Sequence, residues 1–201
     1  MTASCFTPRL FLPALEQALA TPAFGLIADS AWRTFTAQAG PVPPGEAFYL
    51  LWATLDFNAR PTLAERLLLG DVAPAVRQSL TPLVGSAARV FSVERAGGEK
   101  TLVEVLTQTP WRSALAALAP VGSLVFTRLA GGPAAPWPVG PVAVFPCGAR
   151  DVLTSWLLDR YVRARVSGQA VDEATFYRQV GPALYRWWRI QRDASARLRA
   201  A

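Results

Sequence analysis

RVFSVERAGGEKTLVEVL, residues 89–106, decides the fold class, because the spacing of apolar residues changes here from a helical to an extended period. The runs RVFSVE and TLVEVL are rich in β-branched residues, and Gly97 and Gly98 lie between them. Two adjacent glycines supply the positive φ angles that a tight hairpin turn needs. This stretch therefore predicts two antiparallel strands joined by a short turn.

The sequence after the hairpin predicts the rest of a small sheet. SLVFTRL (residues 123–129) and VAVF (residues 142–145) are expected to be two more strands, joined by a proline-rich loop. WRSALAALA, residues 111–119, has the composition of a short helix inserted between the strands. Four short strands with a helix across one end predict a curved antiparallel sheet or half-barrel.

Helical patterns flank this sheet on both sides. Before it, helices are expected at residues 12–20, at residues 48–57, and after the T-x-x-E capping box of Thr62 and Glu65. After it, helices are expected at residues 149–165, at 174–180, and from Pro182 to about residue 199, with a break at Gly181 and Pro182. We expect an α+β protein with a helical segment (1–86), a β unit (87–148) and basic C-terminal helices (149–201), forming one compact unit.

Composition argues against a membrane protein. The chain has 201 residues, enough to bury a self-sufficient core, and 52% of them are hydrophobic. Its longest uncharged run, residues 129–149, is interrupted by prolines and glycines, whereas a membrane-spanning helix needs about 20 mostly apolar residues. The N-terminus has no basic region of the kind that starts a signal peptide. We expect a cytoplasmic protein without a transmembrane segment.

Positive charge is concentrated at the C-terminal end. Residues 150–201 hold ten arginines against five acidic residues, a net charge of +5, whereas residues 1–149 carry a net charge of +1. Every basic residue except Lys100 is arginine, which is typical of a GC-rich bacterial genome. Genome composition does not account for the crowding at one end, which favours an anionic partner.

The residue inventory excludes several kinds of catalysis. The chain has no histidine, which removes Ser-His-Asp and Cys-His nucleophiles and histidine-containing metal sites. Cys5 and Cys147 form no CxxC pair and are expected to be reduced thiols, with one long-range disulfide as the alternative. Asp56 is the best candidate for a catalytic carboxylate, but an Asp at this end of the helix over residues 48–57 is more often an N-terminal cap or a turn residue. We therefore expect a non-enzymatic binding protein with no catalytic residue, metal or cofactor.

Three segments together resemble a known family. FYLLWATLDFNARPTLAERLL, RVFSVERAGGEKTLVEVLTQ, and PVGSLVFTRLAGG followed by VGPVAVFP are similar to the body of uncharacterised bacterial proteins that often end in a SEC-C zinc motif. The matching positions are Trp52, Asp56, Thr62, Leu63, Glu65, Arg66, Leu68, Gly122, Arg128, Gly140 and Pro141. The cysteine-rich tail is absent here, and Ser123 stands where the family more often has Asp. The resemblance spans about half the chain and implies an α+β fold but no activity.

The C-terminal stretch LYRWWRIQRDASARLR, residues 184–199, is the strongest candidate for an interaction surface. In a helix, Trp187 falls on the apolar packing stripe and Trp188 near its rim. Our lead hypothesis is that this helix and the preceding DRYVRAR segment bind DNA or RNA. The predicted contacts are Arg160, Arg163, Arg165, Arg186, Arg189 and Arg192 to phosphates, with Trp188 or Tyr185 stacking on bases.

The same residues fit three other interpretations. The helix could be a docking or homodimerisation element of an adaptor or assembly subunit that meets an acidic protein partner. It could lie on anionic lipid, although the chain has no acyl-anchor motif. It could also be a solvated face of an ordinary packing helix.

Overall fold

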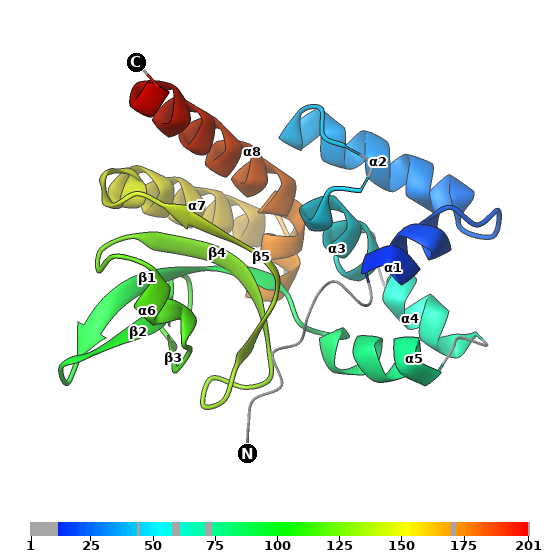
Figure 1. Ribbon diagram of the computed structural model, residues 1–201, viewed down its shortest axis with the longest axis horizontal. Helices are drawn as coiled ribbons and strands as arrows, with labels where there is room; N and C mark the ends of the chain where they lie inside the picture. Colours follow the sequence, from blue (N-terminus) through cyan, green and yellow to red (C-terminus); the bar gives the residue numbers. More distant parts are fainter. Residues whose placement is uncertain (1–11, 44, 58–60, 71–73, 170–171, 201) are drawn as a thin grey trace.

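The computed structural model describes residues 12–43, 45–57, 61–70, 74–169 and 172–200, with most side chains as far as Asp193. Its α-helices are α1 (Leu12–Leu19), α2 (Gly25–Ala39), α3 (Ala47–Leu55), α4 (Leu63–Leu69), α5 (Pro74–Leu80), α6 (Leu115–Leu118), α7 (Arg150–Val166) and α8 (Glu173–Ala200). Its strands are β1 (Ala88–Ala96), β2 (Glu99–Glu104), β3 (Pro110–Trp111), β4 (Leu124–Ala130) and β5 (Trp137–Phe145). This element order confirms the α+β prediction, with helices before and after a central sheet (Figure 1).

The five strands form one antiparallel sheet in the order β3-β2-β1-β4-β5. β1 and β2 are paired up to Ala96 opposite Glu99, so Gly97 and Gly98 form the turn, with φ angles of 59° and 88°. The predicted hairpin is therefore confirmed. The sheet has one strand more than expected because the two-residue β3 pairs with β2, and β5 begins at Trp137 rather than near residue 142.

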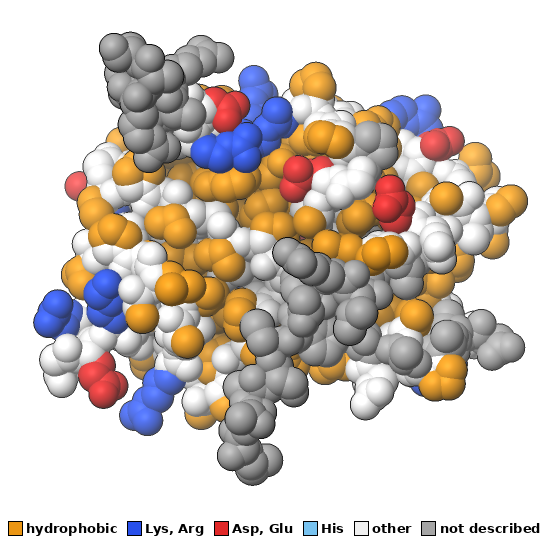
Figure 2. All heavy atoms as spheres, in the orientation of Figure 1, with side chains coloured by type: hydrophobic (Ala, Val, Ile, Leu, Met, Phe, Trp, Pro, Cys, Tyr) orange, Lys and Arg blue, Asp and Glu red, His pale blue; other side chains and the backbone are white. Residues whose placement is uncertain are grey.

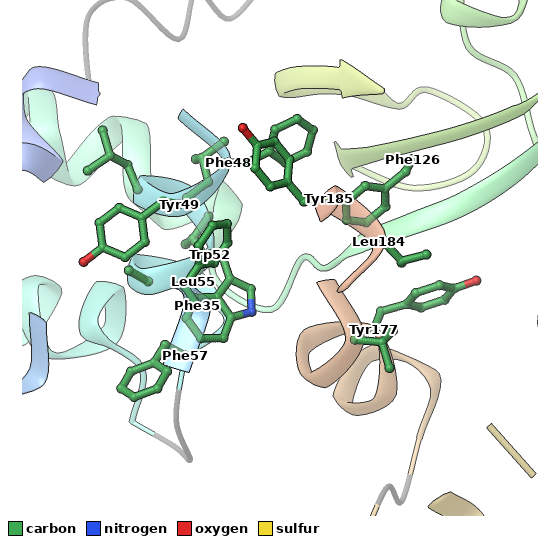
Figure 3. Close-up of a cluster of buried hydrophobic side chains, with 14 of the residues drawn as sticks. Phe35, Phe48, Tyr49, Trp52, Leu55, Phe57, Phe126, Tyr177, Leu184 and Tyr185 are labelled. Carbon is green, nitrogen blue, oxygen red and sulfur yellow. The ribbon is translucent and has the colours of Figure 1, made fainter. Parts of the chain in front are cut away.

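The two faces of the sheet pack against different partners. One face contributes to a large apolar cluster that also contains Leu15 of α1, Phe35 of α2 and Tyr185 of α8. Figure 3 shows the aromatic part of this cluster where α2, α3, the sheet and α8 meet. The opposite face curls around α6 and forms a smaller cluster of Phe91, Val93, Leu102, Leu115, Ala116, Ala119, Val125 and Leu129. The larger cluster thus contains residues from all three sequence segments.

Helix α2 was not predicted from the sequence. Its buried residues are Ala31, Phe35 and Ala39, which follow one another at i, i+4 and i+8. This spacing makes a narrow stripe, and two of its three members are alanines. Apolar periodicity is therefore weak in this helix, although Phe35 lies in the centre of the aromatic core.

Helix α8 runs without a break from Glu173 to Ala200, so the predicted break at Gly181 and Pro182 was wrong. A proline inside a helix leaves the carbonyl four residues earlier without its N–H donor. Here that carbonyl belongs to Arg178, and the indole Nε1 of Trp52 donates to it at 2.8 Å. Gly181 lies against this indole, and a Cβ on it would be in contact with the Trp52 ring at 3.4 Å. This hydrogen bond from α3 therefore replaces the one that is lost at Pro182, and α8 continues past the proline.

The predicted start of α4 is confirmed. Thr62 accepts a hydrogen bond from the backbone N–H of Glu65, and the Glu65 carboxylate accepts one from the N–H of Thr62. These reciprocal bonds are the capping box that the T-x-x-E spacing predicted.

Candidate nucleic-acid interface

The predicted interface residues lie on α7 and α8, which run side by side in the C-terminal part of the fold (Figure 1). Helix α7 carries Arg160, Arg163 and Arg165, and helix α8 carries Tyr185, Arg186, Trp188, Arg189 and Arg192. The structure does not gather all eight on one surface. They are divided between a groove formed where the two helices pair, the opposite side of α8, the C-terminal end of α7, and the core.

The α7–α8 groove has a volume of about 710 Å³. One wall is a face of α7 formed by Trp156, Asp159, Arg160, Arg163 and Ala164. The other wall is a face of α8 formed by Phe176, Gln179, Val180 and Ala183, and Gln38 of α2 and Gln169 complete the lining. Both walls follow the i, i+3, i+4, i+7 spacing of a single helix face, so the pairing of α7 with α8 creates the groove.

Two stacked tryptophans join the helices at this groove. The rings of Trp156 on α7 and Trp187 on α8 lie 5.9 Å apart, with 23° between their planes. The guanidinium of Arg160 lies 4.9 Å from the centre of the Trp156 ring. Arg163 forms a 3.0 Å ion pair with Asp159, and its side chain is 78% exposed. An exposed pair of this kind contributes little to stability, so Arg163 remains free to exchange partners.

Arg186 extends the α8 wall of the groove toward solvent. It follows Ala183 by three residues and Gln179 by seven, so all three lie on one side of α8. The residue is exposed, and no acidic side chain pairs with it among the described residues. Arg160 and Arg163 line the groove, and helical spacing places Arg186 on the same side of α8 as the groove wall. We refer to these three arginines as the basic rim of the groove.

Arg189 and Arg192 lie on the opposite side of α8. Arg189 donates a 2.7 Å hydrogen bond to the carbonyl of Pro41, in the loop between α2 and α3. Arg192 pairs with Asp193 at 3.1 Å and lies over the ring of Trp188, which in turn contacts Phe48. Figure 2 shows basic side chains gathered over α8 beside an apolar part of the surface.

Tyr185, one of the two predicted stacking residues, belongs to the core. It is 3% exposed and contacts the rings of Phe35 and Phe48 (Figure 3). Burial raises the pKa of its hydroxyl, and the neighbouring Glu46 acts in the same direction. The structure corrects this prediction, because a base at the surface would not reach the ring.

Four arginines of these helices stack on an aromatic ring of their own helix. The pairs are Trp156–Arg160, Tyr161–Arg165, Tyr185–Arg189 and Trp188–Arg192, with each guanidinium carbon 4.9 or 5.8 Å from the ring centre. In every pair the arginine follows the aromatic residue by four positions, which places both on one helix face. The stacking restricts the arginine side chain while the edges of the guanidinium keep their N–H donors.

Arg165 is held by a polar chain away from the groove. Its guanidinium donates to the hydroxyl of Tyr161 at 3.1 Å, and this hydroxyl donates to Glu173 at 2.7 Å. The hydrogen bond from Tyr161 lowers the pKa of Glu173. Arg165 therefore links the end of α7 to the start of α8.

A buried charge cluster was the main feature that sequence analysis missed. Asp56 lies at the end of α3, as expected, where its backbone N–H donates to the carbonyl of Trp52. Its side chain is not a cap: the carboxylate binds the guanidinium of Arg128 on β4 and lies 3.6 Å from Nε of Arg178 on α8. Arg128 also donates to the carbonyl of Ser86 at 2.6 Å. Burial raises the pKa of Asp56, and both arginines oppose that effect.

The Asp56 cluster joins the N-terminal helices, the sheet and α8. The cavity beside it has a volume of about 20 Å³ and walls of aromatic and aliphatic side chains. Such a volume accommodates about one water molecule and no organic substrate. We therefore interpret the cluster as structural.

A second buried carboxylate, that of Glu104, also serves the fold. It accepts hydrogen bonds from the Tyr177 hydroxyl at 2.7 Å and from the backbone N–H groups of Leu106 and Thr107. The carboxylate thereby anchors α8 to the turn that follows β2. Because the bond from Tyr177 joins positions 73 residues apart, no local sequence pattern indicates it.

No family model, curated protein or solved structure shows significant similarity to this chain. Within the described part of the chain, no helix is both long enough and apolar enough to cross a membrane. Cys147 is a free, exposed thiol, and Cys5 lies outside the described residues.

Proposed function

We propose that the protein binds nucleic acid through the basic rim of the α7–α8 groove, formed by Arg160, Arg163 and Arg186. The observation that carries this proposal is that two exposed arginines, Arg160 and Arg163, line one concave surface together with Trp156, while the exposed Arg186 lies on the same side of the neighbouring helix α8. Guanidinium groups bind phosphate through paired N–H donors, and clustered positive charge supplies most of the affinity for a polyanion.

The positions of the arginine side chains, as well as their charge, support the proposal. Stacking on Trp156 holds Arg160 in place, so ordering this side chain on binding costs less conformational entropy. Asp159 is the one acidic residue among those that line the groove, and it pairs with Arg163. On the opposite side of α8, Arg189 and Arg192 already contact a carbonyl and a carboxylate, so we assign them a secondary role.

The test is binding of labelled oligonucleotides, measured by fluorescence anisotropy at low salt. The variant Arg160→Gln/Arg163→Gln/Arg186→Gln should lose at least tenfold in affinity. The matched control, Arg33→Gln/Arg95→Gln/Arg112→Gln, removes the same charge from exposed arginines elsewhere and should bind like the wild type. No binding by the wild-type protein would overturn the proposal and favour the protein-partner interpretation.

A further inference from the structure

The lining of the α7–α8 groove has the chemistry to recognise an unpaired nucleobase. This inference rests on the proposed function and concerns what the groove holds once phosphates lie on its rim. The volume of about 710 Å³ is within the range of small-molecule pockets. Its polar groups are arginine, glutamine and one carboxylate, and its aromatic groups are Trp156 and Phe176.

Trp156 supplies a flat aromatic surface beside the basic rim. It is only partly buried, because one side of its ring packs on Trp187 while the residue still lines the groove. Proteins bind single strands by stacking successive bases on such rings while basic side chains follow the backbone. The guanidinium of Arg160 lies over the same ring, so a base that stacks on Trp156 takes the place of this guanidinium, which then contacts the adjacent phosphate.

Two glutamines supply hydrogen-bonding groups for the edge of a base. Gln179 donates to the carbonyl of Gln169 at 2.7 Å, which orients its amide and leaves the amide oxygen as an acceptor. Gln38 faces the same groove from α2. Side-chain amides match the donor and acceptor pairs of base edges, and these edges are fully accessible only where a base is unpaired.

We propose that the α7–α8 groove holds one unpaired base of a single-stranded nucleic acid, stacked at Trp156, with flanking phosphates on Arg160 and Arg186. A duplex would present its backbone to the rim but keep its bases inside the stack. The groove therefore makes the protein selective for single strands over duplexes.

The experiment compares three probes of equal length: a single-stranded oligonucleotide, an abasic strand with the same phosphates, and a duplex. Wild-type protein should bind the single strand about tenfold more tightly than the abasic strand, as expected for one base–aromatic stack. Trp156→Leu keeps an apolar side chain against Trp187 and should remove this difference. Because Trp156 also holds Arg160, affinity for the abasic strand should fall as well, so the ratio of the two affinities is the readout.

A second variant tests the base edge without altering the aromatic contact. Gln38→Ala/Gln179→Ala should lower affinity for the single strand but not for the abasic strand, whereas the control Gln17→Ala/Gln78→Ala changes exposed glutamines elsewhere and should lower neither. Equal affinity of the wild type for all three probes would overturn the base pocket but leave phosphate binding intact. Failure to bind any probe would overturn both proposals.

Discussion

At the scale of single residues, buried polar groups determine how the segments are held together. Asp56 is 7% exposed and lies between two guanidinium groups, those of Arg128 and Arg178. Trp52, Asp56 and Arg128 line the same small cavity at the junction of α3, β4 and α8, so these three positions serve the packing of the N-terminal helices on the sheet.

Asp56→Ala should lower the free energy of unfolding by about 3–5 kcal/mol, because it leaves buried arginines without their anion. Urea unfolding followed by circular dichroism measures this change. The control Asp159→Ala removes an exposed ion pair and should cost no more than about 0.5 kcal/mol. A loss of less than about 1 kcal/mol for Asp56→Ala would contradict the structural role of the cluster.

All four tyrosines, Tyr49, Tyr161, Tyr177 and Tyr185, have raised pKa values, with burial as the largest cause in each case. A raised pKa in the folded state means that folding favours the neutral phenol. The associated stability is fully present below the unfolded-state pKa of about 10 and decreases as pH rises above it.

Tyrosinate absorbance should therefore appear together with loss of helical circular dichroism when the protein is titrated to alkaline pH. Tyr177 dominates this behaviour, because its hydroxyl is buried against the carboxylate of Glu104. Normal ionisation near pH 10 of all four tyrosines in a protein that remains folded would contradict the buried placement.

At the scale of helices and strands, local sequence predicted most elements. The Gly97–Gly98 turn, the capping box at Thr62 and the buried helix around Trp52 depend on neighbours in the chain, and each was located correctly. Helix α2 and the continuity of α8 depend on contacts with distant residues. Apolar spacing and proline rules could not predict those two features.

The bond from Trp52 to the Arg178 carbonyl gives a direct test of how α8 passes Pro182. Trp52→Phe keeps most of the packing but leaves this carbonyl without a donor, and should cost about 1–3 kcal/mol of stability. Pro182→Ala restores a backbone N–H and should recover part of this loss in the Trp52→Phe background. Denaturant unfolding of the four proteins in this double-mutant cycle measures the coupling, and additive effects would contradict it.

At the scale of the whole molecule, the sequence predicted that basic residues gather near the C-terminus but not how they are arranged on the surface. The excess of arginine in residues 150–201 was evident from composition. Which arginines share a surface was not, because that depends on how α7 packs against α8. The groove, its glutamine from α2 and the stacked pair Trp156–Trp187 arise only from that packing.

The salt dependence of oligonucleotide binding tests the central claim most directly. For single strands, log K falls with log salt concentration with a slope of about −0.7 per phosphate contact. Replacing Arg160, Arg163 and Arg186 together by glutamine should make this slope shallower by about 2, whereas the Arg33, Arg95 and Arg112 control should keep the wild-type slope. Identical slopes for the wild type and the groove variant would show that phosphates do not lie on the α7–α8 groove, and would contradict the proposed function.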